Sequence, residues 1–297
     1  MGKTFNMVGG GTNVIANPTQ TWTETDLQGL EIDGTKYKVP LIRPNLLDNW
    51  YFVGGGSQQG GGQFPINQRG KTSYSGDAVP VFDRWMKRGA SYVSAISTDG
   101  VTFTRDAIGF GGISQGVENG ISSLAGKTVT FSVLISAISM DRSWLAITNG
   151  SRVQYYGNGI ALKACESVGL HSLTATIPEN LSQSSLNFWA TVGNIDSTEL
   201  PAGTGSVTIQ AVKLELGSTQ TLAHNEGTEE NPVWVLNEIP NYTEELWKCQ
   251  RYYQLFASST YCPTYGEDYR PPMRLHSPTK GTISIGGTTY YYADANL

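Results

Sequence analysis

Hydrophobic and polar residues alternate along several short segments in the middle of the chain, within residues 129–136, 172–177 and 186–192. In the first segment Val129, Phe131, Val133 and Ile135 fall on one face. A period of two is the period of a β-strand with one buried face. In residues 207–216 the alternation changes phase near Ala211, which predicts either a β-bulge or a strand that is buried on both faces.

Turn-forming residue pairs separate these segments. They are Asp99-Gly100, Asn119-Gly120, Asn149-Gly150, Asn158-Gly159 and the Pro-Ala-Gly of residues 201–203. Asn, Asp and Gly accept the positive φ angles that tight turns need. Short strands at regular spacing with such turns are typical of sandwiches and jelly rolls. We therefore predict an all-β fold in which residues 45–217 form a jelly-roll β-sandwich.

Residues 1–44 are poor in hydrophobic residues and rich in Gly, Asn and Thr. We interpret them as an extended leader or connector. One short hairpin is predicted within residues 30–42, because Asp33-Gly34 lies between two alternating runs.

The remaining residues divide into a polar, Pro-containing linker at 218–240 and a small C-terminal region at 241–297. Residues 241–256 are the best helix candidate, with Thr243 as the expected N-cap. The expected helix face contains Leu246, Cys249, Tyr253 and Phe256. After the helix, Gly286-Gly287 separates two strand-like runs, which predicts a β-hairpin.

Composition and charge argue against nucleic-acid binding and membrane insertion. Charged residues are only 15% of the chain and the net charge is −5, so no basic surface for nucleic acid is expected. No run of about 18 apolar residues is present, and the N-terminus lacks the apolar core of a secretory signal, so we expect no membrane insertion. The odd number of cysteines, Cys165, Cys249 and Cys262, favours buried, reduced thiols over a Cys249–Cys262 disulfide.

The sequence carries no recognisable catalytic motif. It lacks a nucleophile elbow, an HExxH run and a CxxC pair, and its three histidines are far apart, so neither a cofactor nor a metal is expected. A glycosidase needs two carboxyl groups about 5–10 Å apart. The candidates are Asp83, Asp106, Glu118, Asp141, Glu166 and Glu215, and sequence alone brings no two of them together. We therefore expect no enzymatic activity.

Aromatic side chains are the candidates for a binding site. Trp144 lies opposite Leu145 in its alternating segment, and Trp189, with Asn187 on its side, lies opposite Phe188. Aromatic rings stack on the apolar faces of sugars, and amides bind sugar hydroxyls. The candidate ligand-binding residues are Trp144, Trp189, Tyr155, Tyr156 and Asn187. The alternative is that loops or a second subunit cover this face.

Four strings of residues resemble a known family. They are NLLDNWYF at 45–52, INQRG at 66–70, FDRW at 82–85 and KCQRYY at 248–253. Together they resemble tail proteins of phages and prophages, in which such a stretch opens a jelly roll similar to carbohydrate-binding modules. Trp50 and Trp85, within these strings, are interpreted as packing residues, and Asp83 and Arg84 as ion-pairing residues at a strand end.

The resemblance implies a receptor-binding protein of the virion tail, made in the cytoplasm of the host bacterium. Its expected partners are bacterial cell-surface carbohydrate, other tail subunits and further copies of itself, as a trimer. The Gly-rich segment 54–62 departs from the shorter family link between the first two strings. Two alternatives stay open, namely a structural tail or baseplate subunit that binds no glycan, and a glycan depolymerase.

Overall fold

The structure of the protein is a computed structural model. It describes residues 43–54, 64–70, 79–89, 92–105, 111–140, 143–149, 159–181, 186–191 and 204–295, and short backbone segments at 4–5, 14–15, 30–32 and 35–37. Within these ranges, residues 88, 89, 111, 186 and 189–191 are described by their backbone alone. Residues 55–62 of the Gly-rich segment, and Tyr155 and Tyr156, lie outside the described residues.

The chain divides into two compact units, residues 1–42 and 43–297. In the first unit, β1 (Thr4–Phe5) pairs with β2 (Val14–Ile15). β3 (Leu30–Ile32) pairs with β4 (Thr35–Tyr37), with Ile32 opposite Thr35. This register leaves two residues for the connection, and the hairpin predicted from Asp33-Gly34 is confirmed.

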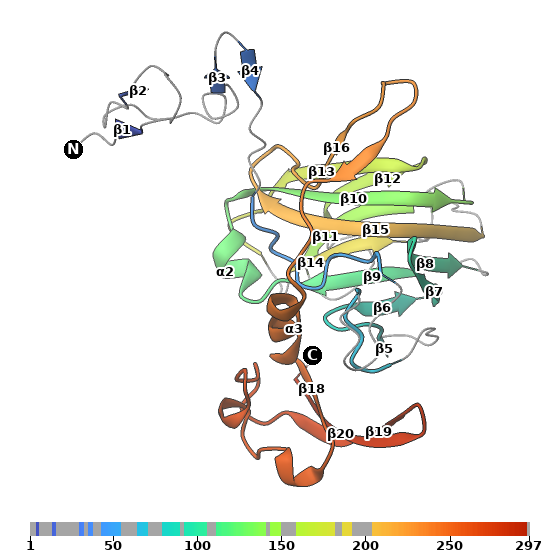
Figure 1. Ribbon diagram of the computed structural model, residues 1–297, viewed down its shortest axis with the longest axis vertical. Helices are drawn as coiled ribbons and strands as arrows, with labels where there is room; N and C mark the ends of the chain where they lie inside the picture. The colour runs from blue at the N-terminus through green and yellow to red at the C-terminus, as the bar shows by residue number, and fades with distance from the viewer. Residues whose placement is uncertain are drawn as a thin grey trace. The chain divides into compact units, whose positions relative to one another are not determined.

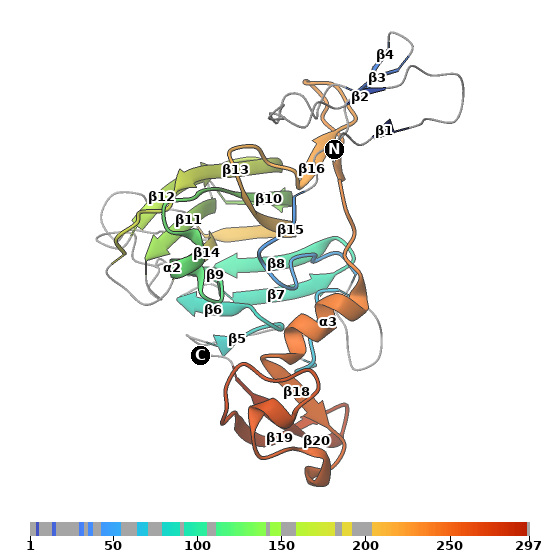
Figure 2. The same cartoon turned by 90° about the vertical axis from the view of Figure 1, so that its left-hand side faces the viewer.

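The second unit contains a sandwich of two antiparallel sheets in the described part of the chain (Figures 1 and 2). One sheet has the spatial order β13 (Gly169–Thr176), β10 (Thr128–Ile138), β15 (Gly205–Leu216), β8 (Gly100–Arg105), β7 (Tyr92–Ser97). The other has the order β12 (Gly159–Cys165), β11 (Ser143–Asn149), β14 (Leu186–Thr191), β9 (Gly111–Gly116), β6 (Met86–Gly89), β5 (Val79–Pro80).

From β9 onward the chain repeatedly crosses between the sheets, and β12, β13, β14 and β15 alternate strictly. This crossing pattern is that of a jelly roll, so the predicted fold class is confirmed. A short helix, α2 (Gly120–Leu124), lies in the connection from β9 to β10.

The core lies between the sheets and follows the alternation that the sequence shows. The side chains of Val129, Phe131, Val133 and Ile135 belong to it and are at most 3% exposed. Phe131 of one sheet meets Phe188 of the other edge to face, with ring centroids 5.7 Å apart. Trp50 and Trp85 are also core residues, at 3% and 0% exposed, which confirms their interpretation as packing residues.

The phase change in β15 has a structural cause. Leu134 of β10 lies opposite Ala211, but the next residue, Ile135, lies opposite Ile209, so Gln210 has no counterpart. This is the predicted β-bulge. The strand is also buried on both faces, because Lys213 and Glu215 are fully buried, as are Val212 and Leu214 of the core. Strand β15 therefore has both predicted features, a β-bulge and burial on both faces.

The C-terminal region differs from its prediction at the helix end. Helix α3 spans Tyr242–Gln250, and residues Tyr253–Phe256 form strand β18. The expectation that Tyr253 and Phe256 share a helix face is therefore wrong. Backbone pairing of β18 with β20 decides the conformation there, because hydrophobic residues at short spacing fit a strand as well as a helix.

The N-cap of α3 is Asn241, not Thr243. The Asn241 side chain accepts hydrogen bonds from the backbone N–H groups of Thr243 and Glu244 at 2.9 and 3.3 Å. Asn at this position satisfies N–H groups that have no partner inside the helix.

A three-stranded sheet follows the helix, in the order β18, β20 (Thr288–Asp294), β19 (Thr279–Ile285). Gly286 and Gly287, with φ of 56° and 82°, form the turn between β19 and β20, which confirms this predicted hairpin. Short 3₁₀ turns occur at Ser259–Tyr261 and Gly266–Asp268. The predicted linker contains a further hairpin, β16 (Ala223–Asn225) with β17 (Trp234–Leu236).

The three cysteines are free thiols, and the expected burial holds for Cys165 and Cys249, whereas Cys262 is half-buried. Burial raises the pKa of Cys165 to about 12 and that of Cys249 well above its usual value, so both thiols stay protonated.

Among the described residues, no helix combines the length and apolar character of a membrane span.

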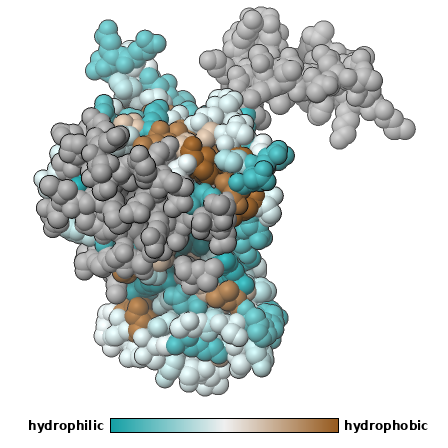
Figure 3. Space-filling model, turned by 180° about the vertical axis from the view of Figure 1, so that it is seen from behind, coloured by the Kyte–Doolittle hydropathy of each residue, from teal (hydrophilic) through white to brown (hydrophobic). Residues whose placement is uncertain are grey.

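Some large hydrophobic side chains remain exposed in the second unit. Figure 3 shows that hydrophobic areas on one side of the molecule are separated by hydrophilic ones. The exposed set is Val168, Leu216, Val233, Ile239, Trp247, Tyr261 and Tyr265. Most of these residues follow the last strand of the sandwich.

Candidate functional site

The predicted aromatic site lies on the six-stranded sheet. In the pairing of β11 with β14, Trp144 lies opposite Thr191, Ala146 opposite Trp189, and Thr148 opposite Asn187. Directly opposed residues of an antiparallel pair share one face of the sheet. Positions 144, 187 and 189 therefore share a face.

The opposite face of these two strands belongs to the core between the sheets, since Leu145, Ile147 and Phe188 are members of its main cluster and the buried Trp144 is not. The prediction that Trp144 lies opposite its hydrophobic neighbours is confirmed. The register adds that positions 144 and 189 are diagonal neighbours on adjacent strands, which places them about 7–8 Å apart.

This outer face is less open than the sequence indicated. Trp144 is 6% exposed, and its neighbours on the same face, Ala146, Thr148 and Ser114, are also buried. The expectation of a solvent-exposed indole at position 144 is therefore wrong. Alternation reports the face on which a side chain lies, but it does not report whether that face is covered. Asn187 is half-buried, while the side chain of Trp189 is outside the described part.

The four strings of the resemblance meet at a second place, where the sandwich contacts the C-terminal region. Asn49 is the centre of this polar junction and is fully buried, with a positive φ of 52°. Its amide nitrogen donates to the carbonyl oxygens of Ile66 and Asp83 at 2.9 and 2.8 Å, and its amide oxygen accepts from the Ile66 N–H at 2.7 Å. Its own backbone N–H donates to the carboxylate of Glu245 on α3 at 2.7 Å. One side chain thus joins three strings, and its backbone joins α3.

Asp83 forms the second part of the polar junction. Its carboxylate accepts from Arg69 at 3.0 Å and from the Gln68 amide at 2.7 Å. Arg69 also contacts Asp294 at 3.1 Å and lies over the ring of Tyr253 at 3.8 Å. Burial raises the pKa of Asp83 to about 6, although Arg69 and Gln68 act in the opposite direction. The predicted ion pairing of Asp83 is confirmed.

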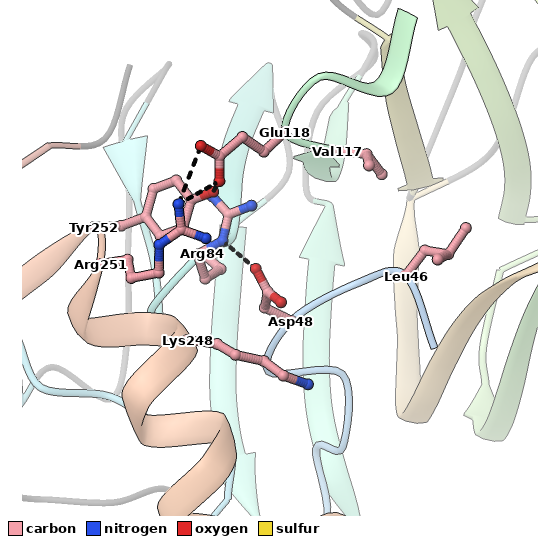
Figure 4. Close-up of a pocket in the computed structure, with 8 residues that line it drawn as sticks. All are labelled: Leu46, Asp48, Arg84, Val117, Glu118, Lys248, Arg251 and Tyr252. Carbon is pink, nitrogen blue, oxygen red and sulfur yellow. Dashed lines mark hydrogen bonds and ion pairs between the residues drawn. The ribbon is translucent and has the colours of Figure 1, made fainter. Parts of the chain in front are cut away.

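A small pocket lies beside this junction (Figure 4), with a volume of about 190 Å³. We call it the junction pocket. It is lined by Leu46, Asp48, Arg84, Val117, Glu118, Lys248, Arg251 and Tyr252. The charged and aromatic lining residues stand across from Leu46 and Val117 in Figure 4.

Ion pairs hold the polar wall of the junction pocket. Arg84 donates to Asp48 at 2.8 Å, which confirms its predicted ion pairing, and its guanidinium lies 3.5 Å from the centre of the Tyr252 ring. Glu118 accepts from the Tyr252 hydroxyl at 2.8 Å and pairs with Arg251 at 3.1 Å. Burial raises the pKa of Tyr252 to about 12, so its hydroxyl remains a donor at neutral pH.

Three of the carboxylates considered for glycoside hydrolysis have structural partners, and a fourth, Glu166, is exposed. Asp83 is buried against Arg69, Glu118 is paired with Arg251, and Glu215 accepts both from the backbone N–H and from the hydroxyl of Thr221. Asp106 and Asp141 lie outside the described residues. Among the described side chains, no three of His, Cys, Asp or Glu gather in a way that would hold a metal ion.

Sequence reasoning missed the junction pocket although it had singled out the strings that form it. Asp48, Arg84, Lys248 and Tyr252 lie in three of those strings. The available signal was the mixture of charged and aromatic residues inside strings that were interpreted mainly as marks of the fold.

Comparisons with known proteins identify no family by sequence. No family model matches the chain, and no curated protein matches it. Among solved structures, the chain is similar to a CBM4 module, with 12% identity and a TM-score of 0.33, over 51% of this chain and 99% of that one.

Two further similar structures are of carbohydrate-binding family 22. The C-terminal family 22 module of Clostridium thermocellum Xyn10B has 16% identity and a TM-score of 0.30, over 51% of this chain and 97% of that one. A xylan-binding domain of CBM 22 has 15% identity and a TM-score of 0.31, over 50% of this chain and 96% of that one.

Proposed function

We propose that this protein is a non-catalytic receptor-binding protein of a phage tail, which binds bacterial cell-surface glycan through its β-sandwich. The observation that carries the glycan site is the register of β11 and β14, which brings positions 144, 187 and 189 together on one face. In this proposal the indoles of Trp144 and Trp189 supply apolar contacts to a saccharide, and the half-buried Asn187 amide supplies hydrogen bonds. We expect one of Tyr155 and Tyr156 to join the proposed site, because neighbouring residues of a strand lie on opposite faces.

The burial of Trp144 gives this residue a particular role in the proposal. In this proposal the Trp144 indole, at 6% exposed, lies at the floor of the site. Asn187 supplies a polar contact at the neighbouring strand. Each aromatic contact is worth roughly 0.5–1.5 kcal/mol beyond burial of area, or about 2- to 13-fold in affinity.

Binding of purified cell-wall polysaccharide to the wild type and to Trp144→Ala and Trp189→Ala tests the site. Each variant is expected to bind about 2- to 13-fold more weakly. Trp247→Ala is the matched control, because Trp247 is 59% exposed on α3, and it is expected to bind like the wild type. Thermal unfolding establishes that the variants are folded. Wild-type affinity in both folded variants refutes the site, and release of new reducing ends refutes the non-catalytic assignment.

The tail location and the trimer rest on the resemblance of the four strings. Light scattering measures the oligomer directly, and a trimer has three times the chain mass of 32.1 kDa. A monomer that binds glycan refutes the trimer and leaves glycan binding intact.

A structural tail subunit is the second candidate. It is favoured by the exposure of Ile239, Trp247 and Tyr261, at 75%, 59% and 69%, because exposed side chains of this size are often buried at subunit contacts. In this case Trp247→Ala lowers the oligomer mass, and the wild type binds no glycan. Glycan binding with an unchanged mass in Trp247→Ala rejects this candidate.

A further inference from the structure

We propose that the junction pocket is a second, separate binding site, which takes a small anion that also carries hydroxyl groups, of the type of a sugar acid. The site uses residues of β-sandwich loops, Lys248 of α3 and the two residues that follow α3, Arg251 and Tyr252, and it shares no residue with the proposed glycan site on β11 and β14. The inference therefore stands or falls independently of the proposed function.

Arg84 supplies the fixed donor of the junction pocket. Its side chain is 9% exposed and is held by Asp48, by the Gly116 carbonyl oxygen at 3.2 Å and by the Tyr252 ring. These contacts use its Nε and Nη2 atoms. Nη1 has no hydrogen-bond partner among the described residues, so a buried and rigidly oriented cation keeps donors for a ligand.

Lys248 supplies a second donor. Its ammonium group is paired with Glu245, which is itself 3% exposed, and an ammonium group has three N–H donors. Burial lowers the pKa of Lys248, but the hydrogen bond and the charge of Glu245 outweigh burial and raise it. Lys248 is therefore charged at neutral pH, and its side chain is 45% exposed.

Asp48 supplies the acceptor that distinguishes a hydroxylated ligand from a simple anion. Its Oδ2 accepts from Arg84, and its Oδ1 has no hydrogen-bond partner among the described residues. A carboxylate oxygen beside two cations repels a bare anion but accepts a hydrogen bond from a hydroxyl group. The ligand therefore needs a negatively charged group, which the cations bind, and a separate hydroxyl group, which donates to Asp48.

The volume and the lining of the junction pocket also fit a sugar acid. A volume of about 190 Å³ is below the roughly 300–1,000 Å³ of pockets for drug-sized ligands, so the ligand is of monosaccharide size. Leu46 and Val117 form an apolar side that suits the C–H face of a sugar ring. Three cations and two carboxylates line the pocket, namely Arg84, Lys248 and Arg251 with Asp48 and Glu118.

Calorimetric titration of the full-length protein with D-glucuronate, D-glucose and sulfate tests the inference. Glucuronate is expected to bind at millimolar concentration or more tightly, and at least ten times more tightly than glucose. Lys248→Gln is expected to weaken glucuronate binding about five-fold or more, with greater loss at low salt, because screening weakens a charged contact. The matched control is Lys280→Gln, an exposed lysine of β19, which is expected to bind like the wild type.

Asp48→Asn distinguishes a sugar-acid site from a simple anion site by the direction in which each affinity changes. It is expected to weaken glucuronate and to strengthen sulfate, because the substitution removes a negative charge next to the anion and weakens the acceptor for the hydroxyl. If both anions bind more tightly to Asp48→Asn, the pocket is a simple anion site and the inference is wrong. It is equally wrong if glucuronate and glucose bind alike or if neither binds, provided that thermal unfolding shows all variants to be folded.

Discussion

Asn49 forms buried hydrogen bonds that no pattern in the sequence indicated. Its side chain satisfies one buried N–H and two buried carbonyl groups from two other strings. A buried polar group that loses its partner costs about 1–3 kcal/mol. We therefore expect Asn49→Ala to lower the free energy of unfolding by about 3 kcal/mol or more, measured by chemical denaturation. Asn180→Ala, at an exposed position, is the control and is expected to change it by less than about 0.5 kcal/mol.

Asp83 makes stability depend on pH in a direction opposite to that of most paired carboxylates. Its pKa rises from 3.8 to about 6 in the folded protein, so the folded state binds the proton more tightly than the unfolded state. The contribution of this group is therefore fully present below about pH 4 and is lost as pH rises through 6, by about 3 kcal/mol.

The measurement compares denaturation of the wild type and Asp83→Asn at pH 4 and pH 7. The wild type is expected to lose stability relative to the variant as the pH rises, because Asn does not ionise. A wild type that gains stability relative to Asp83→Asn over this range contradicts the raised pKa.

Residue roles were only partly predictable from the sequence. Trp50 and Trp85 were interpreted correctly as packing residues because large apolar side chains near a core are buried whatever their partners. Trp144 was placed on the correct face, since alternation fixes direction, but its burial depends on what lies over the sheet. The partners of Asp48 and Asn49 come from positions up to about 200 residues away in the chain, and no local pattern encodes them.

At the scale of elements, α3 offers a direct comparison between the predicted and the observed N-cap. Asn241→Ala is expected to cost about 1 kcal/mol, because it removes the acceptor for the first N–H groups of the helix. Thr243→Ala, at the N-cap position that the sequence favoured, is expected to cost less than about 0.5 kcal/mol, since Thr243 is an exposed residue of the first turn. Chemical denaturation of both variants distinguishes the two assignments, and a larger loss in Thr243→Ala contradicts the structure.

Elements with strong periodicity or strong turn chemistry were predictable, and those held by polar contacts were not. The strands of the sandwich and the Gly286-Gly287 hairpin follow from alternation and from glycines that accept positive φ. The hairpin of β16 and β17 has few buried side chains, and the Asn225 side chain supports it through backbone N–H groups of Gly227 and Val233. Such contacts leave no hydrophobic pattern, so this segment was interpreted as a linker.

At the scale of the molecule, the jelly roll was predictable because its strands alternate, whereas the attachment of the C-terminal region was not. Three polar groups that precede the C-terminal region have their hydrogen-bond or ion-pair partners in it. The Asn49 N–H needs Glu245, Arg69 pairs with Asp294, and Gln68 donates to the Tyr253 carbonyl oxygen at 2.8 Å. In addition, Phe64 and Ile66 form a small apolar cluster with Cys249 of α3.

This dependence predicts the outcome of two truncations. A protein of residues 43–240 lacks α3 and the three-stranded sheet, so buried donors of the polar junction lose their partners and the Cys249 cluster is exposed. We expect it to unfold at a Tm lower by more than about 10 °C, or to lose its cooperative transition. A protein of residues 43–297 keeps every one of these contacts and is the control, with its main transition expected within about 2 °C of the full chain. Calorimetry of both proteins decides between the alternatives. If residues 43–240 unfold at the temperature of the control, the C-terminal region is a passive appendage and the polar junction contributes little to the stability of the sandwich.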